Sequence, residues 1–178
     1  MAVLIEGNSV VIKVAAIFEK LPNEWESFVS VVPNETLCSD NEVARVGFMT
    51  PDDVQHFINK LESHGLVYLG NGKAQDMVVA DQIHGIASKC DWLEFGHIDW
   101  EGNPKHKVAA CRLVGSQEPN IYTPDWWAYE KSLSASYGFV PTGQEDKSLK
   151  YLRHEDGLDV YFNEMTGKEV YIGRTGQT

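Results

Sequence analysis

The chain has 178 residues, 43% of them hydrophobic and 23% charged, a balance typical of globular proteins that fold without metal or disulfide staples. Its formal net charge of −11 argues against binding to duplex nucleic acid, because such binding relies on clustered Lys and Arg contacts to phosphate. We expect one compact domain over residues 1–178, which can be divided into sub-modules at 1–42, 43–106 and 107–178.

The sequence carries no signal of export or membrane insertion. The N-terminal run MAVLIEGNSVVIKV has no basic segment and contains Glu6, so it is unlike a signal peptide. No apolar stretch is long enough for a spanning helix. Cys38, Cys90 and Cys111 are odd in number and widely spaced, which indicates reduced, mostly buried thiols rather than a disulfide framework or a metal site. A cytoplasmic protein without a membrane partner is therefore expected.

The first part of the chain predicts strands around a broken helix. Residues 9–14 read as a strand, and residues 3–5 are expected to pair with it across the intervening Gly-Asn turn. Residues 15–32 carry apolar side chains about one helical turn apart, and Pro22 should kink this helix or split it into two. The alternating sequence VARVGFM, residues 43–49, then predicts a strand with at least one buried face.

The segment TPDDVQHFINKLESHGL, residues 50–66, has the start and stop signals of a helix. Thr50 suits the N-cap, Pro51 the first helical position, and Gly65 the left-handed residue that ends a helix. The apolar residues between them recur at helical spacing and predict one buried face: Val54, Phe57, Ile58 and Leu61.

The pattern then changes to strands. Four are expected at LVYL (66–69), DMVVAD (76–81), DWLEFGHI (91–98) and KVAACRLV (107–114). The last of these should pair antiparallel with the strand before it. The end of the chain reads as a three-stranded meander formed by SLKYLR, LDVYFNE and EVYIGR.

A second segment, TPDWWAYEKSLSASYGF, begins at Thr123 and predicts another helix. It shares its Thr-Pro-Asp start and closing Gly with residues 50–66, but unrelated helices also share these signals. Its apolar stripe, Trp126, Tyr129, Leu133 and Tyr137, is shifted by one residue, which rotates the buried face by about 100 degrees. The similarity thus leaves two explanations open, a duplicated module or common helix signals.

These elements predict an α+β protein with a mainly antiparallel sheet, two to three helices packed on it and a C-terminal three-stranded meander. Two connectivities stay open. Residues 9–69 read as β-α-β-β-α-β, which is ferredoxin-like. A duplication would instead give paired βαβββ modules over 43–98 and 107–174, as in the vicinal-oxygen-chelate superfamily. That superfamily places His and Glu metal ligands on its inner strands, whereas the strands at 43–49 and 107–114 carry no inward His.

Three segments resemble a widespread family of small bacterial cytoplasmic proteins with no established function. They are ETLCSDNEVARVGFMTPDDVQHFINKLESHGL (35–66), DWLEFGH (91–97) and SASYGFVP (134–141). The resemblance covers most of residues 1–142. It implies a bacterial, cytoplasmic protein, and it supplies neither an activity nor catalytic residues.

Residues 81–100 hold the candidate catalytic and metal-binding side chains. On a strand, His97 and Asp99 share one face with Leu93 and Phe95, while Glu94 shares the other with Trp92, Gly96 and Ile98. His97 and Asp99 are candidates for an oriented base or, with His84, for a divalent-metal site. The simpler interpretation is a hydrogen-bonded His at a sheet edge and an Asp that begins a turn. Glu94 is a candidate acid, or the partner of Arg45 or Arg112 in a structural ion pair.

Aromatic side chains gather near residues 122–139 and are the candidate ligand or interface residues: Tyr122, Trp126, Trp127, Tyr129 and Tyr137. Two adjacent tryptophans on one helix cannot both face the same core. One of them is therefore expected to lie at an interface or to line a pocket.

The sequence alone assigns no activity, since the GxxxxGK[ST], GxGxxG, GxSxG and HExxH motifs are all absent. The leading hypothesis is a small-molecule or protein binding or accessory protein with an aromatic-lined pocket and no cofactor. We expect a homodimer formed through the edge strand EVYIGR. The alternatives are a metal-dependent enzyme of vicinal-oxygen-chelate type and an acidic inhibitor or immunity-type protein that binds a cationic partner.

Overall fold

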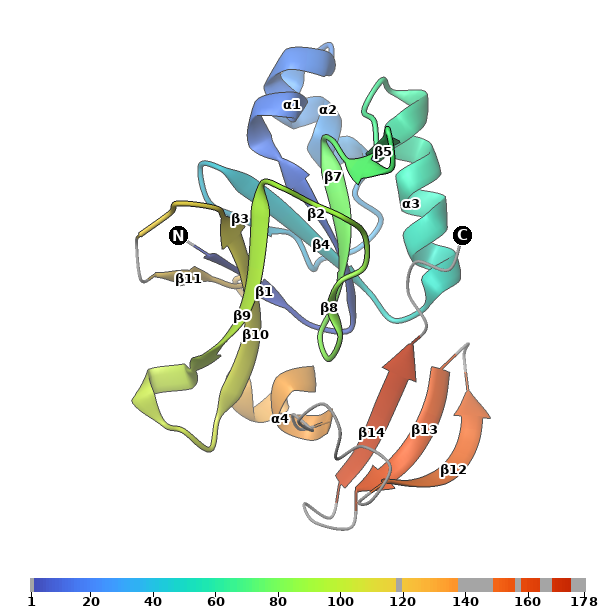
Figure 1. Cartoon of the computed structure of the whole chain (residues 1–178), viewed down its shortest axis with the longest axis vertical. Helices are drawn as coiled ribbons and strands as arrows, with labels where there is room; N and C mark the ends of the chain where they lie inside the picture. Colours follow the sequence, from blue (N-terminus) through green and yellow to red (C-terminus); the bar gives the residue numbers. More distant parts are fainter. Residues whose placement is uncertain (1, 118–119, 138–148, 156–157, 164–167, 174–178) are drawn as a thin grey trace.

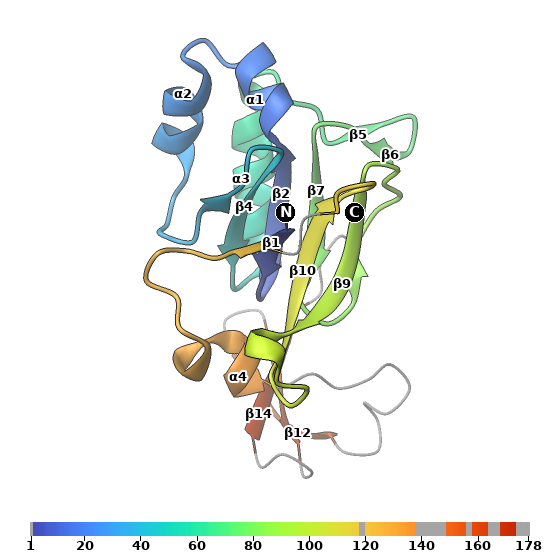
Figure 2. The ribbon, with the colours of Figure 1, turned by 90° about the vertical axis from the view of Figure 1, so that its left-hand side faces the viewer.

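The computed structural model describes residues 2–117, 120–137, 149–155, 158–163 and 168–173. Two β-sheets and a group of helices form three layers, with the helices on one face of the first sheet and the second sheet against its other face (Figure 1 and Figure 2). The protein is therefore α+β, and its sheets are mainly antiparallel.

The first sheet has five strands in the order β3 (Cys38–Ser39), β4 (Val43–Phe48), β2 (Asn8–Lys13), β7 (Met77–Asp81) and β8 (Gly85–Ile86). All of its neighbouring strands are antiparallel. Strands β3, β4, β2 and β7, with the helices between them, follow the β-α-β-β-α-β connectivity of ferredoxin-like folds. This is one of the two connectivities that the sequence predicted. The fourth strand of this unit is β7 instead of residues 66–69, which lead into the small hairpin of β5 (Leu69–Gly70) and β6 (Lys73–Ala74).

Helices cover one face of this sheet. The broken helix is confirmed, since α1 (Val14–Lys20) ends before Pro22 and α2 (Glu24–Val31) begins after it. In α3 (Pro51–Ser63), the Thr50 hydroxyl accepts a hydrogen bond from the Asp53 N–H at 3.2 Å, as expected of an N-cap. The buried residues of α3 are the predicted Val54, Phe57, Ile58 and Leu61.

The second sheet has the order β11 (Ile121–Tyr122), β1 (Ala2–Ile5), β10 (Lys107–Leu113) and β9 (Leu93–Asp99). The predicted antiparallel pair of β9 and β10 is confirmed. The predicted pairing of residues 3–5 with 9–14 is wrong, because the chain turns at Gly7 (φ 58°) and β1 pairs with β10 and β11 instead. Glycine is favoured there both by its positive φ and by the Phe48 carbonyl oxygen, which would lie 2.7 Å from a Cβ.

The hydrophobic core has two parts. The larger part lies between the helices and the first sheet and between the two sheets. Its fully buried residues come from both sheets and from the helices: Val3, Ile5, Ile12, Ile17, Phe28, Leu61 and Met77. The smaller part joins Leu4 and Val108 of the second sheet to Trp127, Tyr129 and Ala135. Residues 127–135 therefore cover part of the outer face of the second sheet.

The helix predicted from Thr123 forms only at its end, and the prediction is wrong for residues 123–132. Residues 123–137 form turns, the short 3-10 helix η2 (Tyr129–Lys131) and the short helix α4 (Leu133–Tyr137). The physical reason is that the indole N–H groups of Trp126 and Trp127 donate to separate acceptors, Glu35 O at 2.7 Å and Glu6 Oε1 at 2.7 Å. The counterpart of α3 that a paired βαβββ plan requires is thus missing from residues 123–137, and common helix signals explain the similarity better.

The C-terminal meander is confirmed. Strands β12 (Leu149–Glu155), β13 (Leu158–Asn163) and β14 (Lys168–Gly173) form an antiparallel three-stranded sheet. It lies beyond α4, away from the helical layer, with β14 the nearest strand to α4 (Figure 1). In the described ranges, none of the helices has the length and apolar character needed to cross a bilayer.

Candidate functional site

A cavity of roughly 400 Å³ lies between β4, the first turn of α3 and residues 126–133. Its apolar lining includes Phe48, Met49, Trp126 and Leu133, and its positively charged lining residues are Arg45 and Lys131. We call this space the Trp126 cavity. Its volume falls within the range of sites that take small organic ligands.

Arg45 is the buried cation of the Trp126 cavity and is only 3% exposed. Its Nε donates to Ser9 Oγ at 2.9 Å, its Nη1 to Thr36 O at 3.3 Å and its Nη2 to Glu6 O at 2.9 Å. All three acceptors are uncharged oxygens, and no carboxylate in the described part of the chain forms an ion pair with Arg45. Burial lowers the pKa of the guanidinium because desolvation disfavours the charged form, whereas nearby Cys38 and Glu6 act in the opposite direction.

Gly47 gives the Arg45 guanidinium its space. Residues 45 and 47 share one face of β4, and a Cβ at position 47 would lie 2.7 Å from Cζ of Arg45 and still closer to Nη2. The Gly47 main chain also fixes the loop before β3, since its N–H donates to Thr36 Oγ1 at 2.7 Å and its carbonyl accepts from Asn34 Nδ2 at 2.8 Å. This wall of the cavity is therefore held by hydrogen bonds.

The two adjacent tryptophans have different environments. Trp126 is 60% exposed and lines the cavity, with its indole position fixed by the hydrogen bond to Glu35 O. Trp127 is 9% exposed and packs edge-on against Trp100, with 4.8 Å between the ring centroids. One indole thus lines a cavity and the other belongs to the core.

The other predicted aromatic residues do not join Trp126. Tyr129 is buried and stacks on His106, with ring centroids 4.4 Å apart. Tyr122 is 37% exposed and belongs to β11 of the second sheet. The side chain of Tyr137 lies outside the described residues. Among the described side chains of this group, Trp126 alone lines the Trp126 cavity.

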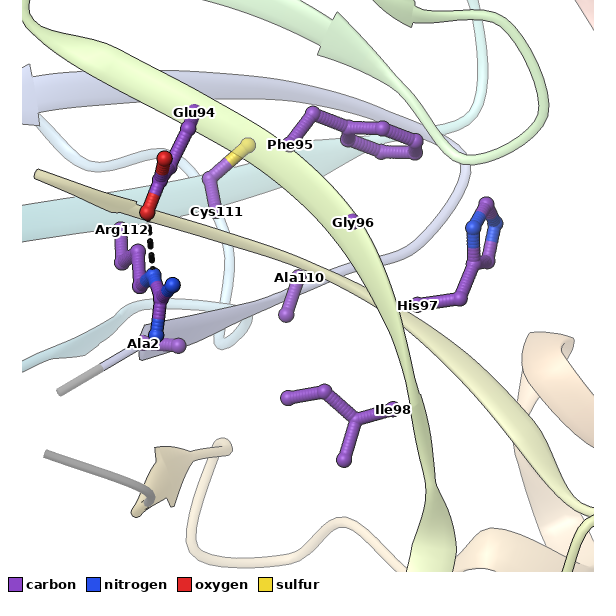
Figure 3. Close-up of a pocket in the computed structure, with 9 residues that line it drawn as sticks. All are labelled: Ala2, Glu94, Phe95, Gly96, His97, Ile98, Ala110, Cys111 and Arg112. Atoms are coloured by element: carbon purple, nitrogen blue, oxygen red, sulfur yellow. Dashed lines mark hydrogen bonds and ion pairs between the residues drawn. The ribbon is translucent and has the colours of Figure 1, made fainter. Parts of the chain in front are cut away.

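Glu94 and His97 line a second hollow, on β9 and β10 (Figure 3). Their side chains leave opposite faces of β9, as the sequence predicted, and the hollow reaches both faces because β9 is an edge strand. Glu94 forms an ion pair with Arg112, its partner in the register of β9 and β10. His97 packs edge-on against Phe95, and burial, then Lys107, lowers the pKa of its imidazole.

The structure does not assemble the predicted metal site. Asp99 forms an ion pair with Lys107, and the exposed His84 lies beside Asp81, with 3.6 Å between His84 Nδ1 and Asp81 Oδ2. Within the described residues, no group of three or more His, Cys, Asp or Glu side chains is arranged to hold a metal ion. The predicted alternative partner of Glu94, Arg45, is also wrong, because Arg45 lies in the first sheet and pairs with β2 and β3 residues.

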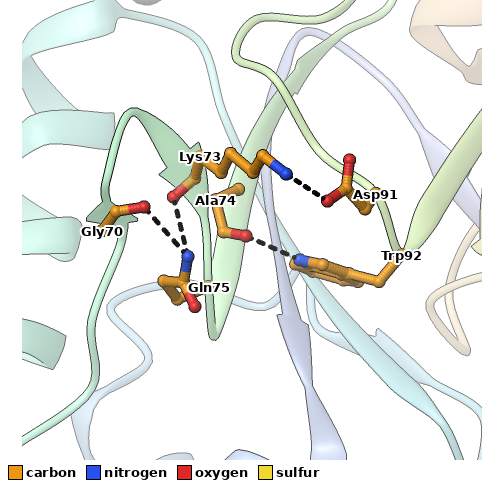
Figure 4. A network of polar contacts seen from close by, with 6 residues as sticks. All are labelled: Gly70, Lys73, Ala74, Gln75, Asp91 and Trp92. Carbon is orange, nitrogen blue, oxygen red and sulfur yellow. Dashed lines mark hydrogen bonds and ion pairs between the residues drawn. The ribbon is translucent and has the colours of Figure 1, made fainter.

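A further polar network has a structural role. Trp92 Nε1 donates to Ala74 O at 3.0 Å and Lys73 forms an ion pair with Asp91 at 2.9 Å, so the β5-β6 hairpin is held against the segment before β9 (Figure 4). Gln75 Nε2 closes the hairpin by donating to Gly70 O at 3.0 Å. These contacts account for the positions of the hairpin and of the segment before β9.

Comparison with protein-family models, with curated proteins and with solved structures finds no match for this chain.

The sequence did not predict that Arg45 and Lys131 line a cavity. Arg45 stands among apolar residues in VARVGFM, and a charged residue within such an apolar strand sequence was the available signal. Lys131 had no such signal, because its place beside the cavity follows from the turns at residues 123–131 that replace the predicted helix.

Proposed function

We infer that this protein is a binding protein that takes a small organic molecule in the Trp126 cavity. The observation that carries this inference is the exposed indole of Trp126, held by Glu35 O above a cavity that also contains a buried guanidinium. An exposed aromatic wall with a few fixed polar groups is the usual composition of a small-molecule site.

The hollow at Glu94 and His97 gives less support to the rival hypothesis of a metal-dependent enzyme. Glu94 and Asp99, the carboxylates of the rival metal-dependent enzyme hypothesis, are both held in ion pairs with basic side chains. An acidic inhibitor is supported by the net charge of −11 alone. The binding hypothesis is supported by a cavity that combines an exposed indole with a buried guanidinium.

A fragment screen by ligand-observed NMR tests the proposal. We expect fragments with an aromatic ring to give saturation-transfer signals with the full chain, and to lose most of that signal with Trp126→Ala. The matched control is Phe18→Ala, because Phe18 is an exposed aromatic residue, 47% exposed, on α1 and away from the cavity lining.

The two variants separate specific from general binding. Signals that fall equally in both variants indicate unspecific contact with exposed rings. A screen in which no fragment depends on Trp126 would contradict the proposed function.

The homodimer and the cytoplasmic, bacterial origin belong to the same proposal. Among the described strands, β14 is hydrogen-bonded to β13 alone, which leaves an edge that a second copy can pair with. Light scattering after size-exclusion chromatography tests the dimer, and a monomeric mass at working concentration would exclude it.

A further inference from the structure

The Trp126 cavity contains one buried cation and no buried anion that is free to bind it. Lys131 and Asp53 line the cavity as exposed residues of opposite charge, so water screens both. Glu6 also lines it, but its carboxylate already accepts hydrogen bonds from Trp127 Nε1 and from the N–H and hydroxyl of Ser134. The buried charge left without a direct counter-ion is that of Arg45.

Arg45 has donor capacity to spare. A guanidinium carries five N–H groups. Three of them donate to Ser9, Thr36 and Glu6. Even if the neighbouring Cys38 sulfur takes a fourth, one N–H group remains.

A buried cation whose oxygen partners are all neutral is costly, because those oxygens replace its hydration shell without neutralising its charge. A carboxylate is the ligand group that meets both needs, since it accepts charge-assisted hydrogen bonds and carries the opposite charge. The lining also has an apolar part, which is formed by Trp126, Phe48, Met49 and Leu133.

We propose that the ligand of the Trp126 cavity is a small organic acid whose carboxylate binds Arg45 and whose apolar or aromatic body packs on Trp126. This rests on the proposed function and narrows it to one ligand class. Lys131, at the cavity lining, attracts the same acid before it reaches Arg45.

Matched pairs of acids and amides test the proposal on the unaltered protein. The probes are benzoate with benzamide, phenylacetate with phenylacetamide, and cinnamate with cinnamamide, which differ within each pair in charge but little in shape. We expect at least one acid to bind about tenfold more tightly than its amide in titrations followed by NMR, as one charge-assisted hydrogen bond supplies. The arginine side-chain Nε–Hε resonance of Arg45 should shift with the acid.

Variants place the effect at the cavity. Trp126→Ala should weaken both members of a pair, whereas Lys131→Gln should weaken the acid by a few-fold and leave the amide unchanged. Arg45→Met should remove the preference for the acid. Because Arg45 is buried and this variant can fail to fold, Lys131→Gln and the unaltered protein decide the question independently.

The outcomes separate the two proposals. Amides that bind as tightly as acids, with dependence on Trp126, would overturn the acid proposal and leave the binding function standing. Acids that bind equally well to Trp126→Ala occupy another site and also overturn the acid proposal. No Trp126-dependent binding by acids, amides or the fragment library would overturn both.

Discussion

Glu6, in the β1-β2 turn, and Arg45, in β4, are charged residues next to apolar ones, and both are buried. Their charged groups do not pair directly, because Arg45 binds the main-chain oxygen of Glu6 while the Glu6 carboxylate faces Trp127 and Ser134. Glu6 therefore joins the β1-β2 turn to residues more than a hundred positions away. Glu6 thus contacts Arg45 of the Trp126 cavity and also Trp127 and Ser134, which adjoin the lining residues Trp126 and Leu133.

The substitution Glu6→Gln tests this role at the residue scale. Both carboxylate oxygens of Glu6 accept hydrogen bonds, so an amide must place an NH₂ group against the N–H donors of Trp127 or Ser134. We expect the free energy of unfolding in urea to fall by about 1–3 kcal/mol, the cost of leaving a buried donor unsatisfied.

The control is Glu94→Gln, which removes the same charge from the ion pair with Arg112. Both side chains of that pair are more than 40% exposed, so the loss should stay below about 1 kcal/mol. Equal losses in the two variants would show that net charge, and not the buried contacts of Glu6, sets the effect.

At the scale of elements, two segments with the same Thr-Pro-Asp start reach different structures. Thr50 caps the 13-residue helix α3, whose apolar stripe packs on the first sheet. Thr123 precedes turns, because Trp126 and Trp127 are held by different acceptors on either side of the chain. A local start signal therefore gives a stable helix only where the apolar residues that follow it can be buried together on one face.

The substitutions Thr50→Ala and Thr123→Ala measure this difference. Thr50→Ala removes the acceptor of the Asp53 N–H and should lower the free energy of unfolding by about 1 kcal/mol. Thr123→Ala removes no helix cap, and we expect a change within about 0.5 kcal/mol. Urea unfolding followed by circular dichroism checks both, and a loss from Thr123→Ala as large as from Thr50→Ala would mean that residues 123–137 form a capped helix.

At the scale of the whole molecule, the three layers enclose two of the three cysteines. Cys38 and Cys111 are buried and Cys90 is half-buried, all as free thiols. Burial raises the pKa of the Cys38 thiol, although Arg45 opposes this, and burial raises the pKa of the Cys111 thiol as well. The thiolate, which is the reactive form, is thus disfavoured at both buried positions.

Reaction with a thiol reagent reports on this packing. We expect Cys90 to react first in the native protein, and Cys38 and Cys111 to react only on the timescale of opening or in urea. Peptide mapping by mass spectrometry after brief alkylation identifies the labelled residue. Prompt labelling of Cys111 in native protein would contradict the burial of the second sheet against the first.

Elements with a local cause could be predicted from the residues alone. Pro22 splits the first helix, Thr50 and the stripe from Val54 to Leu61 define α3, and alternation places Glu94 and His97 on opposite faces of β9. The α+β class and the C-terminal meander follow from the same local patterns.

Features that depend on partners far away in the sequence could not be predicted in this way. The turn at Gly7 sends β1 to β10 and β11, and a hairpin pattern cannot distinguish these strands from β2. The second predicted helix gives way to turns because Glu6 and Glu35, far away in the sequence, bind its two indoles. Arg45 lines the cavity because Gly47 leaves room for its guanidinium, while Ser9 and Thr36 accept hydrogen bonds from it. Such long-range hydrogen bonds form only once the layers have packed, and for this reason the local sequence did not reveal the cavity.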